Sequence, residues 1–311
     1  MKKITVLTPC YNEEENVINI YEEVKKQFAR LPQYEYEHLF IDNASTDKTV
    51  DLLKDIASID KKVKIIVNTR NFGHIRSPFY AILQSKSDAL ISMAADMQDP
   101  PQMLPQFLEK WEEGYKIVIG IKTQSKESPL MFFVRKLYYD LIGKLSEIEH
   151  IKNFTGFGLY DKIVIETLKN IDDPYPYFRG LICDLGYKRF EIKYTQNKRE
   201  RGITKNNFYI LYDLAMLGIT NHSKVPLRLA TFLGFTFSAV SFVISVCYLI
   251  YKLLFWDKFE LGLAPLILGI FFFSSIQLFF IGILGEYIGS IHTQILKRPM
   301  VIEKERINFD E

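Results

Sequence analysis

Charged residues are unevenly spaced along this chain, and the change in spacing divides it into two parts. Up to about Lys224, a charge recurs every few positions, whereas Leu229–Tyr251 and Leu261–Gly285 contain no Asp, Glu, Lys or Arg. Each of these stretches exceeds the ~20 residues that an α-helix needs to cross a hydrocarbon core. Helices of soluble proteins nearly always carry a polar face, which both stretches lack. The pattern therefore predicts two transmembrane helices rather than two core helices.

The polar break between these stretches, Lys252–Glu260, predicts a short turn with Trp256 and Phe259 as interfacial anchors. Its two lysines are offset by two acidic residues. The uncompensated positive charges lie outside the hairpin, at Lys224, Arg228, Lys297, Arg298, Lys304 and Arg306. By the positive-inside rule, both ends of the chain are expected in the cytoplasm.

Strand and helix patterns alternate from the N-terminus to Ile121. Short apolar runs predict strands at 4–9, 38–42, 63–67, 89–93 and 117–121. Helical spacing of apolar residues predicts a helix after each of the first two strands and another at 103–111, and Asn12 with Glu15 has the spacing of a capping box. This order predicts a doubly wound α/β domain on a parallel sheet, with ligands at the carboxyl ends of the strands.

Two aromatic-rich stretches, 129–145 and 207–219, lie between this domain and the apolar helices. Each is compatible with a core helix or with an amphipathic helix in the membrane interface, and their position favours the interface. The net charge of +2 excludes the strongly basic surface of a general nucleic-acid binder. The three cysteines are far apart, which argues against a disulfide framework or a structural zinc site.

Polar residues cluster where four of the predicted strands end, at 9–16, 42–49, 70–73 and 96–101. One such cluster alone is typical of a turn or a helix start. Four at one edge of one sheet indicate a binding site, and their chemistry suits a nucleoside diphosphate. Asp42 can accept a hydrogen bond from a base, and Arg70 adds a fixed positive charge. Asp96 with Gln98 offers oxygen ligands for Mg²⁺ or Mn²⁺.

Together these clusters resemble family 2 glycosyltransferases of the GT-A fold, in particular the polyprenyl-phosphate branch that includes dolichyl-phosphate mannose synthases and bacterial undecaprenyl-phosphate glucosyltransferases. The resemblance covers nearly the whole chain. Beyond the four clusters it rests on Phe178-Arg179-Gly180-Leu181, on Arg199, Gly202, Thr204 and Lys205, on Pro226-Leu227-Arg228, on Gly285-Glu286-Tyr287 and on Arg298-Pro299.

The resemblance implies an inverting transfer of a hexose from a UDP-sugar, UDP-glucose or a related UDP-hexose, to polyprenyl (undecaprenyl) phosphate for cell-surface glycan synthesis. An acceptor phosphate is already an anionic nucleophile at neutral pH, so no general base is required. The implied catalytic residues are Asp96, Gln98, Arg179 and Lys205, with the metal on Asp96 and Gln98. The implied donor ligands are Pro9, Tyr11, Asn12, Glu13, Asp42, Arg70, Asn71 and Gly73, and the implied acceptor-phosphate ligands are Arg179, Arg199 and Lys205.

The basic stretch Lys198–Arg201 is alternatively a solvated loop beside anionic lipid. Asp99 is expected to cap the helix that starts near Pro100. The expected organisation is a cytoplasmic GT-A domain at 1–205, an amphipathic juxtamembrane helix at 206–225, the transmembrane pair at 226–290 and a cytoplasmic tail at 291–311. The resemblance further implies the bacterial inner membrane and a possible homo-oligomer, a tetramer in the family.

Four positions depart from the family pattern. Asn43 and Ala44 replace an Asp-Gly, His74 stands where many relatives carry lysine, and Ala94 replaces the first aspartate of the Asp-x-Asp motif. Ala94 keeps open a degenerate relative that binds nucleotide or lipid as a regulatory or scaffold protein. A processive polysaccharide synthase is disfavoured because its Gln-x-x-Arg-Trp signature is absent. A lipid-translocation component would leave the nucleotide-binding domain unexplained.

Overall fold

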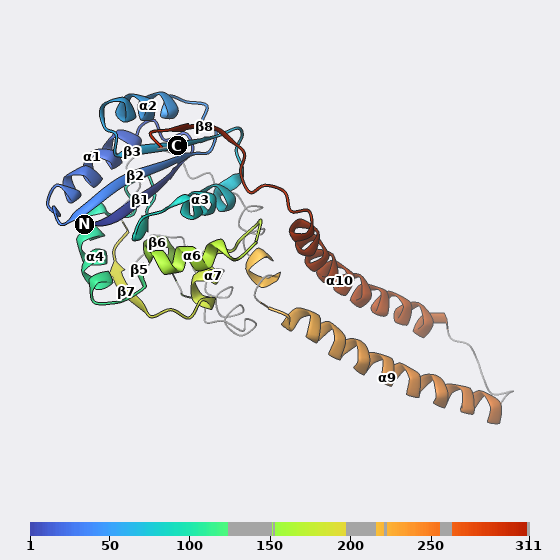
Figure 1. Cartoon of the computed structure of the whole chain (residues 1–311). Helices are drawn as coiled ribbons and strands as arrows, with labels where there is room; N and C mark the ends of the chain where they lie inside the picture. Colours follow the sequence, from blue (N-terminus) through green and yellow to red (C-terminus); the bar gives the residue numbers. More distant parts are fainter. Residues whose placement is uncertain (124–150, 152, 197–215, 221–222, 256–262, 310–311) are drawn as a thin grey trace.

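The computed structural model describes residues 1–123, 151, 153–196, 216–220, 223–255 and 263–309. Within that part of the chain, eight strands form one sheet in the order β7-β5-β6-β4-β1-β2-β3-β8. Helices cover both faces of the sheet, and two long helices, α9 and α10, project away from this head (Figure 1).

The four strands that carry the predicted polar clusters pair in parallel, as expected. β1 (Lys2–Cys10) pairs with β2 (Tyr34–Asp42) and with β4 (Ala89–Ser92), and β2 pairs with β3 (Val63–Asn68). These strands are buried on both faces, so they read as almost continuous apolar runs. Their carboxyl ends meet at one edge, which places the predicted clusters side by side.

The other half corrects the expectation of a wholly parallel sheet. β6 (Phe154–Asp161) runs antiparallel to both β4 and β5 (Ile117–Lys122), and β5 pairs in parallel with β7 (Arg189–Tyr194). A Cβ at Gly158 of β6 would lie 2.5 Å from the carbonyl oxygen of Val118, so glycine is what allows β6 to approach β5 this closely. No turn signal in the sequence specifies this insertion.

Two apolar layers hold the helices to the sheet. One face carries α1 (Val17–Phe28), α2 (Thr49–Ile59) and α4 (Leu104–Glu112), the last preceded by the 3₁₀ turn η1 (Pro101–Met103). The opposite face carries α3 (Gly73–Gln84), α6 (Lys162–Lys169) and α7 (Phe178–Asp184). The capping-box prediction is wrong, because α1 begins at Val17 and Asn12 has a positive φ of 54° in the preceding loop.

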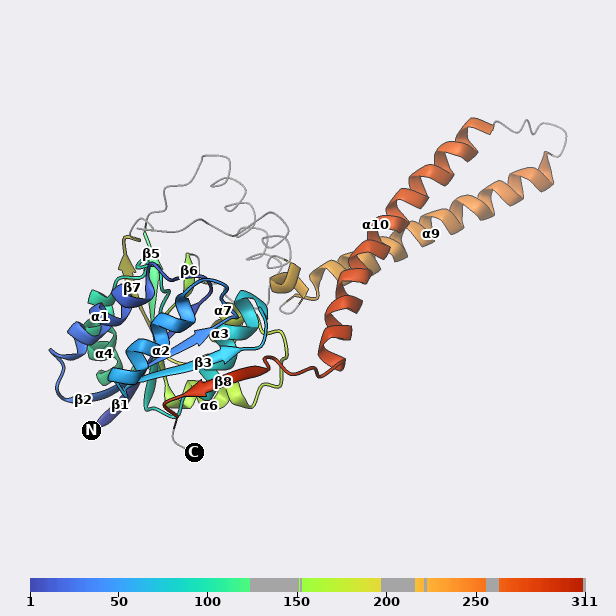
Figure 2. The ribbon, with the colours of Figure 1, turned by 90° about the horizontal axis from the view of Figure 1, so that it is seen from above.

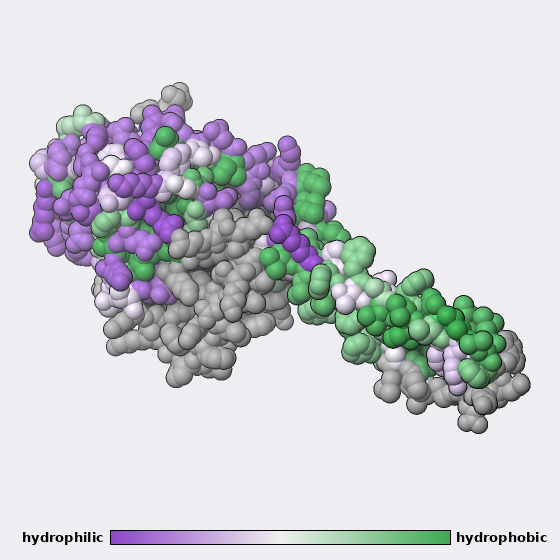
Figure 3. All heavy atoms as spheres, turned by 90° about the horizontal axis from the view of Figure 1, so that it is seen from below, coloured by the Kyte–Doolittle hydropathy of each residue, from purple (hydrophilic) through white to green (hydrophobic). Residues whose placement is uncertain are grey.

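The two predicted apolar helices are present as α9 (Val225–Leu254) and α10 (Leu263–Ile295). Each contains a stretch of 27 residues long and apolar enough to cross a membrane, Val225–Tyr251 and Gly269–Ile295, and the apolar 18-residue window within each has no buried residue. Phe235 and Phe271 are 74% and 72% exposed. The pair extends from the polar head as an apolar hairpin (Figure 3), which disagrees with the alternative of buried core helices. The stretch 129–145 and most of 207–219 lie outside the described residues, and 216–220 form one helical turn.

The chain returns to the head after the hairpin. β8 (Glu303–Ile307) pairs antiparallel with β3 at the edge of the sheet (Figure 2). The segment expected only as a tail is therefore part of the head fold. The C-terminal end of the hairpin is therefore joined to the head through β8.

Candidate active site

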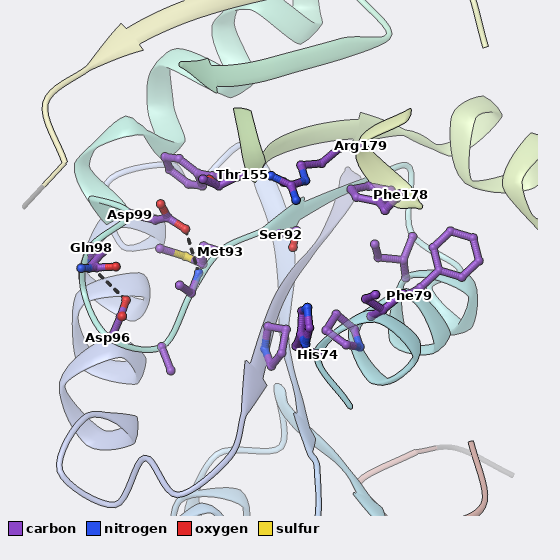
Figure 4. Close-up of a pocket in the computed structure, with 18 of the residues that line it drawn as sticks. His74, Phe79, Ser92, Met93, Asp96, Gln98, Asp99, Thr155, Phe178 and Arg179 are labelled. Atoms are coloured by element: carbon purple, nitrogen blue, oxygen red, sulfur yellow. Dashed lines mark hydrogen bonds between the residues drawn. The ribbon is translucent and has the colours of Figure 1, made fainter. Parts of the chain in front are cut away.

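A pocket of about 570 Å³ lies at the edge of the sheet where the predicted clusters converge. Its wall combines the ends of β1, β4 and β5 with residues of β6, of α3 and of the first turn of α7. Figure 4 places Asp96, Gln98 and Asp99 on one side and His74, Phe79 and Phe178 on the other. The polar members of the wall are Glu13, His74, Ser92, Asp96, Gln98, Asp99, Lys122, Thr155, Tyr177, Arg179 and Gln196.

The loops after β1 and β2 are joined by hydrogen bonds. The Asn12 N–H donates to Ser45 Oγ at 2.8 Å, and Asn12 Oδ1 accepts the Thr46 N–H at 2.8 Å. Ser45 in turn donates its N–H to Asp42 Oδ1 at 2.9 Å and its hydroxyl to Asp42 Oδ2. Asn12, which was expected to contact the donor, thus has a clear role in shaping the second loop.

Asp42 is fully buried at the end of β2. Burial raises the pKa of its carboxyl group, and the hydrogen bonds from Ser45 act in the opposite direction. Both carboxylate oxygens bind Ser45, so a contact with a nucleobase would have to share one of these oxygens. The carboxylate therefore supports the loop and is available to a ligand only through its second lone pairs.

Asn43 connects the second loop to the third. Its side-chain amide donates to Asn71 Oδ1 (2.9 Å) and to the Gly73 carbonyl oxygen (3.1 Å), while its Oδ1 accepts the Phe72 N–H (2.9 Å). An aspartate at this position has no N–H to donate, so it would lose the first two bonds. The guanidinium of Arg70 lies over the Phe72 ring, 4.0 Å from its centroid.

The loop after β4 presents two oxygen-bearing side chains to the pocket. Asp96 is 4% exposed, and its Oδ1 accepts the Gln98 N–H at 3.2 Å. Met97 between them has a φ of 60°, which turns the backbone sharply. Gln98 Oε1 accepts a hydrogen bond from Gln196 at 2.9 Å. Among the described residues no group of three or more His, Cys, Asp or Glu side chains is arranged around one point. One carboxylate and one amide oxygen fit Mg²⁺ or Mn²⁺, which take their other ligands from water and substrate phosphates.

Asp99 does not cap the following helix, contrary to expectation. Its Oδ2 accepts the Ala94 N–H at 3.1 Å, and its Oδ1 accepts the Tyr194 hydroxyl at 2.9 Å, so it closes the loop that carries Asp96. The carboxyl is almost completely buried, which raises its pKa despite these two bonds. Ala94 lines the pocket beside these two aspartates.

Three side chains that can carry positive charge line the same pocket as Asp96 and Asp99. Arg179, in the first turn of α7, lines the pocket together with His74 and Lys122. The pKa of the His74 imidazole is lowered by burial and by the nearby positive charge of Arg179, so the His74 ring is neutral at pH 7. Lys122 lies at the end of β5 and its charge lowers the pKa of Asp99. Sequence reasoning missed Lys122, although its place at the end of a predicted strand was a usable signal.

The structure brings together part of the predicted site. Pro9, Glu13, Asp96, Gln98 and Arg179 line the pocket. Tyr11, Asn12, Asp42, Arg70, Asn71 and Gly73 lie on the loops of the same edge, next to the pocket wall rather than in it. Arg199 and Lys205 lie outside the described residues.

Comparison with known proteins identifies the class of enzyme to which this fold and pocket belong. The model of the Glycosyl transferase family 2 matches residues 5–169. "Uncharacterized glycosyltransferase YkcC" of Bacillus subtilis is 32% identical over 309 residues, which cover 98% of this chain and 94% of that protein. "SfII prophage-derived bactoprenol glucosyl transferase" of Shigella flexneri is 32% identical over 304 residues, covering 97% and 98%.

Among solved structures, mannosyl-3-phosphoglycerate synthase from Rubrobacter xylanophilus superposes with a TM-score of 0.49 at 14% identity, covering 70% of this chain and 71% of that one. The family model and the full-length relatives confirm the resemblance read from the sequence motifs. The chain belongs to glycosyltransferase family 2.

Proposed function

We propose that this glycosyltransferase is a membrane-bound hexosyltransferase that moves a hexose from a UDP-sugar to polyprenyl phosphate with inversion. The observation that carries the proposal is the arrangement of one pocket: the oxygens of Asp96 and Gln98 lie on one wall, and Arg179 and Lys122 supply positive charge around it. The reaction joins two phosphate-bearing substrates, so it requires both a counter-ion for the leaving diphosphate and fixed cations for the acceptor. The name of the Shigella relative supports a glucosyl donor and a prenol acceptor.

The donor is expected to lie over the ends of β1, β2 and β3. The loop that the buried Asp42 holds would face the nucleoside, Arg70 and the backbone of residues 71–73 would face the diphosphate, and Asp96 with Gln98 would hold Mg²⁺ or Mn²⁺. The ion, when bound, neutralises the charge that develops on the leaving UDP. Glu13, Pro9 and Tyr11 complete the donor side.

The acceptor is expected to enter from the side of α7, which lies toward the hairpin (Figure 2). We expect Arg179 and Lys122 to bind its phosphate, and the family resemblance adds Arg199 and Lys205 to this set. The acceptor oxygen is already ionised, so the site needs to orient it rather than deprotonate it. Apolar helices α9 and α10 keep this pocket against the bilayer from which the lipid phosphate emerges, with the head in the cytoplasm.

The direct test uses the full-length chain in lipid nanodiscs with undecaprenyl phosphate and a panel of UDP-hexoses in the presence of Mg²⁺. We expect a hexosyl phospholipid product of inverted anomeric configuration from one or two donors. Arg179→Ala should impair use of the lipid phosphate while UDP binding, measured by calorimetry, stays near wild type. No transfer from any UDP-hexose, with UDP binding intact, would favour the degenerate relative that Ala94 kept open.

A further inference from the structure

The segment that follows the hairpin binds the edge of the head that carries Arg70. β8 pairs with β3 through Ile65 with Ile307 and Val67 with Glu305. The contact continues past the end of β3, where the N–H and the hydroxyl of Thr69 both donate to the carbonyl oxygen of Ile302, at 2.9 and 3.1 Å. Thr69 immediately precedes Arg70, so the C-terminal segment holds the first residue of this loop.

The same loop is held on its other side by Asn43, which follows the end of β2. Asn43 binds Asn71, the Phe72 N–H and the Gly73 carbonyl oxygen, as described above. Residues 69–73 are therefore fixed between the end of β2 and the C-terminal segment. The guanidinium of Arg70 makes a cation–π contact with Phe72 of the same loop, so the position of Arg70 depends on the position of the loop.

The C-terminal segment is itself anchored at several points. Arg306 donates to Gln84 Oε1 of α3 at 2.7 Å and to the Tyr80 hydroxyl at 3.4 Å. The Asn308 amide donates to the carbonyl oxygens of Ala57 and Val63, at 2.7 and 2.8 Å. Val301 is only 6% exposed. These contacts give Ile302 a fixed position from which to hold Thr69.

We propose that the C-terminal segment Met300–Phe309 is a positioning element of the donor site. By holding Thr69 through the Ile302 carbonyl, it keeps Arg70 in the geometry that binds the UDP diphosphate. The inference rests on the proposed function, which assigns Arg70 to the donor diphosphate.

The sharpest variant is Thr69→Val, which removes the hydroxyl donor and keeps the shape of the side chain. UDP binding with Mg²⁺ is measured by calorimetry on the full-length protein, together with steady-state kinetics. Loss of one neutral hydrogen bond should raise the UDP Kd and the donor KM by ~3-fold to ~10-fold. The acceptor KM and kcat should stay within about twofold, because the acceptor side of the pocket is untouched.

A second variant ends the chain after Pro299 and removes both Thr69 contacts. It should raise the UDP Kd at least as much as Thr69→Val, and the peptide containing Thr69 should exchange its amide hydrogen faster. Thr69→Val keeps the whole chain, so its result stands whether or not the shortened chain folds. The matched control is Lys54→Gln in α2. It removes the 2.7 Å ion pair between Lys54 and Glu305 of β8 and leaves the hydrogen bonds between Thr69 and Ile302 in place.

The control should leave the UDP Kd unchanged. If Lys54→Gln raises the UDP Kd as much as Thr69→Val does, the cause is a general loosening of β8, and the proposed role of Thr69 is overturned. It is also overturned if the UDP Kd is unchanged in both Thr69→Val and the shortened chain. Arg70→Ala separates this inference from the proposed function. If Arg70→Ala keeps wild-type UDP affinity, the donor assignment itself fails. If Arg70→Ala weakens UDP binding and the Thr69 variants do not, the positioning role alone fails.

Discussion

The hydroxyl of Tyr194 donates a 2.9 Å hydrogen bond to Asp99, a residue 95 positions earlier in the chain. The other carboxylate oxygen of Asp99 accepts the Ala94 N–H. The end of β7 thereby braces the loop that presents Asp96 and Gln98 to the pocket. The shape of the proposed metal site thus depends on a strand far from it in sequence.

Tyr194→Phe should destabilise the head more at neutral pH than at acid pH. Burial raises the pKa of Asp99, and the Tyr194 bond lowers it, so the variant raises this pKa further. A carboxyl group with a raised folded-state pKa destabilises the fold as the pH rises from its ordinary pKa of 3.8 through the folded value. We expect a loss of about 1–3 kcal/mol near pH 7 and a smaller loss near pH 4. Thermal unfolding across this range tests it, and a difference that does not change with pH contradicts it.

Asp96→Ala should abolish turnover, because the leaving diphosphate would lose the carboxylate ligand of its counter-ion, an effect of several kcal/mol. Gln98→Ala should reduce turnover less, since water can replace a neutral ligand. Chelation of divalent ions should stop the wild-type reaction, and added Mn²⁺ or Mg²⁺ should restore it. Thermal unfolding of each variant serves as the folding control. Turnover that survives both chelation and Asp96→Ala would remove the metal from the mechanism.

Restoring the missing carboxylate by Ala94→Asp should not improve the enzyme. The new charge would lie beside Asp96 and Asp99, which are 4% and 6% exposed, and like charges in a partly buried site repel. We expect unchanged or lower turnover of the preferred UDP-hexose, with Ala94→Asn as the uncharged control of similar size. A silent wild type that Ala94→Asp activates would identify the chain as a decayed enzyme.

Ala44→Gly should stabilise the head without changing the reaction. Ala44 has a φ of 61°, a left-handed conformation that costs an alanine about 1–2 kcal/mol and a glycine almost nothing. After the greater chain entropy of glycine is subtracted, we expect a gain of about 0.5–1 kcal/mol, or a Tm about 1–4 °C higher. Ala44→Val should lower the Tm, because a branched side chain fits this conformation worst. Equal Tm values for both variants would show that the backbone carries no such strain.

The hairpin should place its turn outside the cell and both of its ends inside. β8 pairs with β3 in the head, so the chain after α10 returns to the side from which α9 departs. A reporter fused at Trp256 should read as external, and one fused after Glu311 should read as cytoplasmic. An insertion after Lys224 provides the cytoplasmic control. Opposite readings would exclude a head that meets cytoplasmic UDP-sugars.

The sequence alone determined the elements that depend on local pattern. The apolar runs of β1 to β4 and the uninterrupted apolar helices α9 and α10 were predicted because burial on both faces, or exposure to lipid on all sides, requires apolar residues at successive positions. The convergence of the clusters at 9–16, 42–49, 70–73 and 96–101 followed because parallel strands end at one edge. Asp96 and Gln98 were therefore identified before the pocket was seen, and Arg179 was identified through the family resemblance.

Only the tertiary structure decided the features that depend on distant partners. β6 lies antiparallel between β4 and β5, where Gly158 permits a close approach to Val118, and β8 is a charged strand with no apolar alternation of its own. Asp99 binds Tyr194 instead of capping a helix, and Thr69 binds Ile302, because these groups meet only after the chain has folded. The spacing of residues along the sequence does not predict such long-range pairs. Their hydrogen bonds are set by the sheet order, which the whole chain determines.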